Sequence, residues 1–319
     1  MKLILKNHQS PGDIMMFTSL VRDIKKAYPH FRLRVKSSAD ALFLNNPNIE
    51  ETELVPRVFN TNAKEKSARA DTTDDGWLAV DVHYGDETQL GKDVSNPYSI
   101  HKCGKHKKHF MNGMIGYMNK LLDLDIKLTE LRPDIYLTEE EKKPLSGLSE
   151  KYWVVVPGGK PDYPRKIWPA RNWDALFEIL SDVNFVQMGG NEADHIKPQF
   201  RTRKNLTDLT GKTSIREVLS LIYNAQGVIT PITFAMHVTA CFPDKPCIVV
   251  AGGGEHHTWE AYPGHDFLHT CGVLPCCRDG GCWSGECSNK NTHTGEQRCM
   301  EMLTAEIVAD IVKKHNWEN

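Results

Sequence analysis

The sequence predicts an α/β protein made of two doubly wound, Rossmann-like domains with parallel sheets that face a cleft. Its 319 residues are too many for one compact core and enough for two. Short apolar runs end in glycine turns and are followed by amphipathic segments, and this pattern restarts after a linker at 144–150. We therefore expect domains over 1–147 and 148–319, with ligands bound beyond the carboxyl ends of the strands, between the two halves.

The first half opens with a strand at 3–5, a glycine turn and a helix. Apolar residues recur on one helical face from Ile14 to Ile24. Asp13 stands where this helix begins, a favourable position for a carboxylate. Further along we expect strands over 31–35 and 77–82, a short helix over 40–44, a surface loop over 60–76 and a helix over 114–124.

The second half repeats the order of strand, glycine turn and helix. A strand over 152–156 ends at Gly158 and Gly159. Ser214 is placed to cap a helix that runs through Tyr223, and Glu217 stands at the offset of a capping box. The other elements expected here are strands over 185–188, 228–229 and 247–251, and helices over 173–180, 234–241 and 304–314.

The composition excludes several classes of partner. The net charge is −2, so nothing favours nucleic acid or a membrane surface as the main partner. No apolar run is long enough to span a bilayer, and the first residues lack a secretory signal, so we expect a cytoplasmic protein. Thiols stay reduced there, and the nine cysteines therefore suggest metal binding before disulfides.

Six of the nine cysteines fall between 271 and 299, among glycines and polar residues that cannot form a hydrophobic core. A metal held by thiolates would close these loops, so we expect a cysteine knuckle at about 271–299 with a structural ion. Zinc is the default ion and iron its competitor. The alternative is a set of free thiols or a stray disulfide. The preferred ligands are Cys276 or Cys277, Cys282, Cys287 and Cys299, with Cys271 and the unused neighbour in reserve.

Four motifs, in their order along the chain, resemble glycosyltransferase family 9, the heptosyltransferase-like enzymes of the GT-B fold. Each motif is weak alone, and together they span nearly the whole chain. They are Pro11-Gly12-Asp13 with Tyr28-Pro29; Pro157-Gly158-Gly159 with Lys166-Ile167-Trp168-Pro169; Gly189-Gly190-Asn191-Glu192; and the run 209–214 followed by Met236-His237 and a strand ending in Gly252-Gly253.

The resemblance implies inverting transfer of a sugar, heptose or another, from a nucleotide-diphosphate sugar to a hydroxyl of an acceptor saccharide, lipid-linked glycan or protein. It implies no organic cofactor. Asp13 would be the general base, and Lys166 with the neighbouring backbone would hold the diphosphate. The remaining donor-binding residues implied are Gly12, Gly158, Gly159, Gly189, Gly190, Glu192, Thr233 and His237. The simpler interpretations are a helix cap for Asp13, a solvated lysine and a core histidine.

One segment departs from the family pattern. Where the family reads Asp-Ser-Gly-Pro-Met-His, residues 232–237 of this chain read Ile-Thr-Phe-Ala-Met-His, so Ile232 replaces the acid. Ile232 cannot accept a hydrogen bond from a sugar or ribose hydroxyl, so the donor must be held differently. Thr233 can still offer a hydroxyl to a phosphate. Two alternatives stay open. One is a nucleotide-sugar epimerase of similar fold, in which Asp13 and His237 would do proton chemistry, and the other is a non-catalytic sugar- or metal-binding protein, in which the loss of the acid at Ile232 marks a decayed active site. One branch of the family, the autotransporter heptosyltransferases, carries a four-cysteine iron finger in a similar place.

Overall fold

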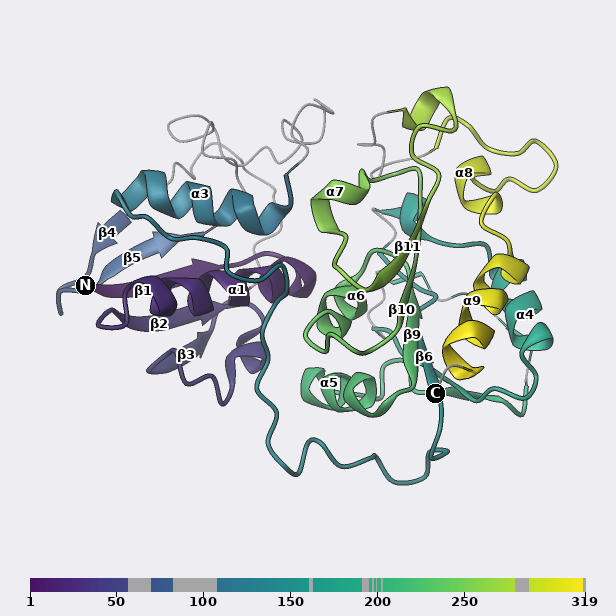
Figure 1. The fold of residues 1–319 in the computed structure, drawn as a ribbon, viewed down its shortest axis with the longest axis horizontal. Helices are drawn as coiled ribbons and strands as arrows, with labels where there is room; N and C mark the ends of the chain where they lie inside the picture. The colour runs from purple at the N-terminus through teal and green to yellow at the C-terminus, as the bar shows by residue number, and fades with distance from the viewer. Residues whose placement is uncertain are drawn as a thin grey trace. The chain divides into compact units, whose positions relative to one another are not determined.

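The computed structural model describes residues 1–56, 70–82, 108–160, 163–190, 195–196, 198, 200–201, 203–278 and 287–317. The chain divides into two compact units, Met1–Thr138 and Glu139–Asn319, and each contains a sheet flanked by helices (Figure 1). The division lies in the connection that follows α3, the last helix of the first unit, and so does the expected boundary at 147. This connection forms neither helix nor strand from residue 123 to 152.

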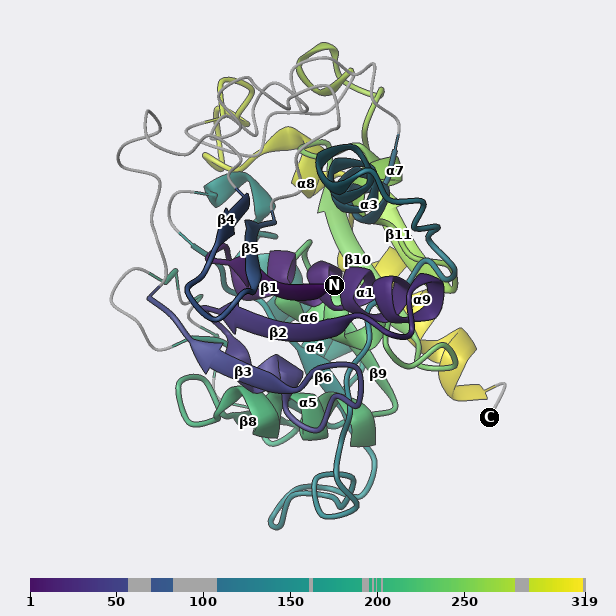
Figure 2. The ribbon, with the colours of Figure 1, turned by 90° about the vertical axis from the view of Figure 1, so that its left-hand side faces the viewer.

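The sheet of the first unit has the strand order β3-β2-β1-β5-β4 in the described residues. Neighbouring strands are parallel except at β4, which runs antiparallel to β5. Helices α1 and α3 pack beside one another (Figure 2). The bounds are β1 (Lys2–Asn7), α1 (Pro11–Ala27), β2 (Arg32–Ser37), the 3₁₀ turn η1 (Asp40–Phe43), β3 (Glu51–Leu54), β4 (Ala70–Thr72), β5 (Leu78–Asp81) and α3 (Phe110–Leu122).

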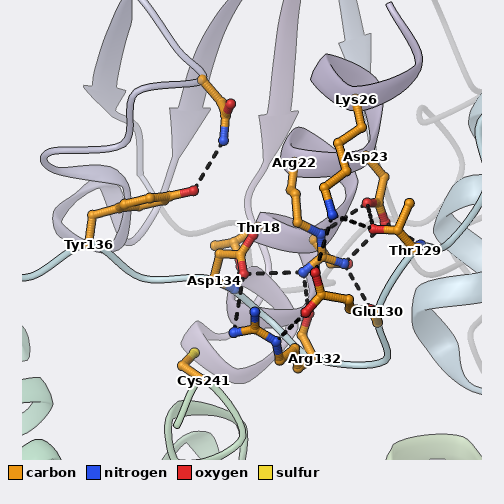
Figure 3. Close-up of polar contacts among 12 residues, drawn as sticks. Thr18, Arg22, Asp23, Lys26, Thr129, Glu130, Arg132, Asp134, Tyr136 and Cys241 are labelled. Carbon is orange, nitrogen blue, oxygen red and sulfur yellow. Dashed lines mark hydrogen bonds and ion pairs between the residues drawn. The ribbon is translucent and has the colours of Figure 1, made fainter. Parts of the chain in front are cut away.

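Helix α1 is buried on more than the single face that its periodicity predicts, since every side chain from Ile14 to Ile24 is buried. This stretch includes Arg22 and Asp23, whose charges are satisfied inside the protein. Figure 3 shows the Arg22 guanidinium between the Asp23 and Asp134 carboxylates, at 2.9 and 3.2 Å. The Thr129 hydroxyl donates to Asp23 Oδ1 at 2.6 Å. The network fastens the segment after α3 to the centre of α1.

The second unit has the strand order β11-β10-β9-β6-β7-β8 in the described residues, and all neighbours are parallel. Helices α4 and α9 lie on one side of this sheet and α5 and α6 on the other (Figure 1). The strands are β6 (Trp153–Val155), β7 (Phe185–Gln187), β8 (Leu206–Asp208), β9 (Gly227–Thr230), β10 (Cys247–Gly252) and β11 (His265–His269). The helices are η3 (Pro164–Lys166), α4 (Ala170–Ile179), α5 (Ile215–Asn224), α6 (Phe234–Thr239), α7 (His257–Glu260), η4 (Pro275–Cys277), α8 (Arg298–Glu301) and α9 (Ala305–Trp317).

Tryptophans fill the core between this sheet and the pair α4 and α9. Trp153, Trp168 and Trp173 are fully buried, and the last two meet edge to face with ring centroids 4.9 Å apart. The indole N–H of Trp168 donates to the Leu303 carbonyl at 2.7 Å, so a buried polar atom has a partner. Gly227 makes room for Trp153, because a Cβ there would lie 2.4 Å from its ring.

The structure confirms the predicted α/β class with two mainly parallel sheets. It also confirms the capping box of α5, in which the Ser214 N–H donates to Glu217 Oε2 at 2.7 Å. The predicted loop over 60–76 is wrong at Ala70–Thr72, which forms the short edge strand β4. Its three exposed residues pair on one side only, so they need no apolar pattern. Within the described residues, no helix has the length and apolar character needed to cross a bilayer.

The predicted helix over 114–124 is four residues out of place at its start, because α3 already begins at Phe110. The Met111 N–H donates to His109 Nδ1 at 3.3 Å, which caps the first turn. Asp123 then ends the helix in the left-handed conformation, with φ of 51°.

Candidate active site

The donor-binding residues predicted in the second unit gather at one edge of its sheet. Gly158 and Gly159 follow β6, Gly189 and Gly190 follow β7, and Thr233 follows β9. Because these strands are parallel neighbours, their carboxyl ends meet at the same edge, where ligands of such sheets bind. Glu192 lies outside the described residues.

The first glycine pair is packed against the backbone that follows β7. A Cβ on Gly158 would lie 2.6 Å from the Ile196 carbonyl oxygen, so only glycine fits there. Gly159 and Ile196 pair as an antiparallel bridge, with the Ile196 N–H donating to the Gly159 carbonyl at 2.8 Å. The Gly159 N–H donates to Ile196 at 3.4 Å. The pairing fixes the loop that leads to Lys166.

The second glycine pair also lies close to its neighbours. The Gly189 carbonyl accepts from the Gly211 N–H at 2.8 Å. A Cβ on Gly190 would lie 3.2 Å from the His195 ring. The two loops that follow β7 and β8 are therefore held together where the backbone carries no side chain.

The segment after β9 contains both the departure from the family pattern and the predicted histidine. Ile232 is buried, and the Thr233 hydroxyl lies 2.7 Å from the Thr230 hydroxyl. His237 is 3 % exposed, and its Nδ1 lies 2.7 Å from the Tyr262 hydroxyl. Burial holds the pKa of Tyr262 well above its usual value. This is the geometry of a core histidine, and it disfavours the epimerase interpretation, which needs His237 for proton chemistry on a substrate.

Lys166, the predicted diphosphate ligand, ends the 3₁₀ turn η3 and forms an ion pair. Its ammonium lies 2.5 Å from Glu255 Oε1. Glu255 follows the three glycines at the end of β10, and its side chain is 5 % exposed, whereas that of Lys166 is 24 % exposed. The pair joins the loop after β6 to the loop after β10 at the ligand-binding edge.

Sequence reasoning missed Glu255. A signal for it was present, because it is a carboxylate that directly follows an apolar strand and the glycine run Gly252-Gly253-Gly254. The same kind of signal was used for Asp13 at the glycine turn after β1.

Three of the predicted metal ligands line one cavity of about 60 Å³, namely Cys276, Cys287 and Cys299. This space is several times that needed for a water molecule. Arg165 and Gly254, the residues next to Lys166 and Glu255, line it as well. The cysteine cavity therefore lies against the loops that carry the ion pair.

Cys277 is placed differently from the three cysteines of the cavity. Its thiol donates to the Thr270 carbonyl at 3.2 Å, and burial raises its pKa. A Cβ on Gly253 would lie 2.6 Å from the Cys277 sulfur, so the glycine admits this cysteine against the end of β10. These contacts favour Cys276 over Cys277 as a ligand.

The cavity is not a completed metal site in this structure. Among the described residues, no group of three His, Cys, Asp or Glu side chains is placed to hold an ion. Cys282 lies outside them. Burial raises the pKa of Cys299. Thiols are ligands that zinc and iron take in proteins, so the chemistry of the three side chains fits a thiolate site.

The chain after the cavity braces the loop that carries Lys166. The Gln297 side chain donates to the Pro164 carbonyl at 2.6 Å. The Leu303 carbonyl accepts from Trp168 and from Asn172, which lies in the first turn of α4. Arg171 also forms an ion pair with Glu301. The cysteine-rich segment thus has a structural connection to the predicted diphosphate ligand.

Asp13, the predicted base, lies in the first unit at the third position of α1. Its Oδ2 accepts from the Ser10 N–H at 3.1 Å, and Pro11 and Gly12 form the turn between them. Asp13 is thus a capping residue of α1. The turn before it is tied to β2, since the Ser38 hydroxyl donates to the Gln9 carbonyl at 2.8 Å.

Two units with mainly parallel sheets, and glycine turns and a lysine at the edge of the second sheet, fit the architecture of GT-B glycosyltransferases. The model of glycosyltransferase family 9 (heptosyltransferase) matches residues 98–269. The chain belongs to this family and is a glycosyltransferase. No curated protein matches it.

Solved structures share the fold at low identity. A family 9 glycosyltransferase from Veillonella parvula is 15 % identical, with TM-score 0.67 over 100 % of this chain and 98 % of that one. ADP-heptose LPS heptosyltransferase II of E. coli is 16 % identical, with TM-score 0.61 over 100 % and 99 %. The iron-containing dodecameric glycosyltransferase TibC from enterotoxigenic E. coli is 16 % identical, with TM-score 0.63 over 99 % and 76 %.

Proposed function

We propose that this chain transfers a sugar, a heptose or another, from a nucleotide-diphosphate sugar to an acceptor hydroxyl with inversion at the anomeric carbon. The observation that carries the proposal is Lys166 at the carboxyl edge of the second sheet, among glycine loops that allow close approach of a ligand. A lysine there stabilises the negative charge that develops on the leaving diphosphate. Family membership supports a donor of this type.

In the proposed step, the acceptor oxygen attacks the anomeric carbon from the side opposite the diphosphate. The new carbon–oxygen bond forms while the bond to the phosphate oxygen breaks, and the nucleoside diphosphate leaves with the electron pair. The Asp13 carboxylate takes the acceptor proton, which accounts for inversion in a single displacement. The acceptor would be a saccharide, a lipid-linked glycan or a protein.

The decisive experiment is product analysis with a panel of nucleotide sugars and the Asp13→Asn variant. We expect a new glycoside from wild type and a turnover lower by about 10²–10⁴-fold in the variant, because a general base is lost. Nucleotide binding and the melting temperature should change little, since asparagine can still cap α1. Near wild-type turnover in the variant would show that Asp13 is only a cap. Binding without any turnover in wild type would favour the non-catalytic alternative.

We also propose that Cys276, Cys287 and Cys299, with Cys282 as fourth ligand, bind one structural metal ion. Three of these thiols already line a single cavity. Metal sites of this kind seldom exist before the ion binds, so the ligands are expected to close around it. The ion would be zinc, or iron as in the iron-containing TibC. A closed four-thiolate shell would leave no position for substrate.

Elemental analysis of protein purified without added metal tests this site. About one ion per chain is expected, colourless if zinc and absorbing visible light if iron. Cys287→Ser should lose the ion, while Cys247→Ser, which alters a cysteine buried in β10, should keep it. Protein that holds almost no metal and whose cavity thiols all react with a mild reagent would contradict the site.

A further inference from the structure

The Lys166–Glu255 pair raises a question that the proposed function does not answer. A lysine that receives a diphosphate is here already bound to a carboxylate, with 2.5 Å between the charged atoms. The carboxylate is held in place, because Glu255 is almost completely buried and follows β10, an interior strand of the sheet. Lys166 is partly exposed on a short 3₁₀ turn and has a flexible stem.

The two partners therefore differ in how they respond to an incoming ligand. A buried glutamate cannot follow Lys166 toward solvent, whereas the lysine ammonium has three donors and can turn toward a new anion. A diphosphate carries more negative charge than one carboxylate, so it competes effectively for the ammonium. A negative charge fixed beside the phosphates also repels them, and the repulsion is strong in a partly buried site.

We propose, on the basis of the proposed function, that Glu255 is the counter-ion that the donor diphosphate displaces from Lys166. Glu255 acts through Lys166 and limits how tightly the enzyme holds the diphosphate. Before binding, the pair keeps the ammonium neutralised and in place. After transfer, the carboxylate competes for Lys166 again and favours release of the nucleoside diphosphate.

A competing role and a purely positioning role for Glu255 predict opposite changes in diphosphate affinity. If Glu255 only oriented Lys166, removing its charge would weaken diphosphate binding. If Glu255 competes with the diphosphate, removing its charge strengthens binding, because the lysine is freed and the repulsion disappears. The Glu255→Gln variant separates the two roles, since glutamine keeps the shape and can still accept a hydrogen bond.

Calorimetry is the test, with ADP, UDP, GDP and CDP and their nucleosides as probes. The affinity of E255Q for the diphosphate that wild type binds best is then compared with the affinity of wild type. We expect about tenfold tighter binding of the diphosphate, an unchanged affinity for the nucleoside, and a steeper loss of diphosphate affinity with added salt. A merely structural role for Glu255 would not steepen the salt dependence.

A matched control comes from a second half-buried pair in the same unit. Arg216 and Glu141 lie 2.5 Å apart, with 14 % and 24 % of their side chains exposed. E141Q removes the same charge from an ion pair outside the predicted donor residues, so it should leave diphosphate affinity unchanged. An equal gain in both variants would trace the effect to net charge and overturn the proposal.

The outcomes separate this inference from the proposed function. Diphosphate binding in E255Q that is unchanged or weaker overturns the role of Glu255 and leaves the transferase proposal intact. A wild type that binds none of the four diphosphates overturns both. If E255Q does not fold, Glu255→Asp is measured instead, because its shorter side chain keeps the charge but holds the Lys166 ammonium less firmly, and we expect it to bind the diphosphate more tightly than wild type. Diphosphate binding by E255D that is unchanged or weaker would then overturn the proposal.

Discussion

Two ion-pair clusters, one in each unit, show how burial decides what a charge can do. In the first unit, Arg22 and Asp23 are 6 % and 0 % exposed, and Arg22 also donates to the Glu130 and Arg132 carbonyls at 2.8 and 2.9 Å. The guanidinium is fully occupied by the protein (Figure 3). In the second unit, Lys166 keeps one side in solvent while Glu255 is buried. The first cluster therefore stabilises the fold, whereas Lys166 in the second cluster can exchange its carboxylate partner for another anion.

The largest expected effect on stability comes from the Arg22 cluster of the first unit. Arg22→Met should destabilise the protein by about 3–5 kcal/mol, because it leaves the buried Asp23 carboxylate without its cation and leaves Asp134 with only the more distant Arg132, at 3.9 Å. Chemical denaturation measures this change. Nucleotide binding below the unfolding transition should be unaffected, since all of the predicted donor residues except Gly12 lie in the second unit. A loss under about 1 kcal/mol would mean that water or other groups replace the guanidinium.

The second effect is a difference in stability loss between removing Lys166 and removing Glu255 from their ion pair. Lys166→Met should cost about 3 kcal/mol of stability, since it removes the cation that lies 2.5 Å from the buried Glu255 carboxylate. Glu255→Gln should cost clearly less, because the remaining ammonium is partly exposed and can be hydrated. Comparing the two denaturation midpoints checks this asymmetry. Equal losses of stability would show that leaving Lys166 without Glu255 costs as much as leaving Glu255 without Lys166.

Lys166→Met should also weaken binding of the diphosphate by about 10–100-fold relative to the nucleoside, as expected when a hydrogen bond to a charged group is lost. Equal losses for both ligands would indicate a folding defect or a contact elsewhere. The nucleoside therefore serves as the internal control for the site.

The sequence predicts most of the second unit because its elements carry strong local signals. Alternating apolar strands and glycine turns placed β6, β7, β9 and β10 and the edge where their loops meet. The edge strands β8 and β11 were missed, because β8 has three residues that are mostly exposed and β11 reads His-Asp-Phe-Leu-His, without alternation of apolar and polar residues. Such strands are defined by pairing with a neighbour and not by their own pattern.

The candidate site was predicted less completely than the fold. Lys166 was found through its motif, and the glycine run before Glu255 was a signal that went unused, but the contact between these two residues becomes visible only when β6 and β10 lie in one sheet. For the same reason the spacing of cysteines could not separate Cys276 from Cys277, which differ in whether they face the cavity or the Thr270 carbonyl. Long-range contacts of this kind leave no local sequence signal.

The smallest effect on stability is expected for an exposed ion pair, which is the most exposed of the three compared. Arg32 and Glu50 lie 2.6 Å apart with 51 % and 39 % of their side chains exposed. The hydrogen bond from Arg32 lowers the pKa of Glu50 below its ordinary value of 4.5. A carboxyl group with a lowered pKa stabilises the folded state above that ordinary value, and this contribution is lost as the pH falls through the folded pKa. Exposed pairs of this kind contribute little.

Glu50→Gln should therefore leave stability at pH 7 nearly unchanged and should flatten its decline only slightly below pH 4.5. Denaturation midpoints of wild type and E50Q between pH 7 and pH 3 measure the difference. High salt should remove it, because exposed charges are screened. A loss at pH 7 comparable with that of Arg22→Met would contradict the rule that burial sets the contribution of these pairs, since both clusters contain an arginine in contact with a carboxylate and differ mainly in exposure.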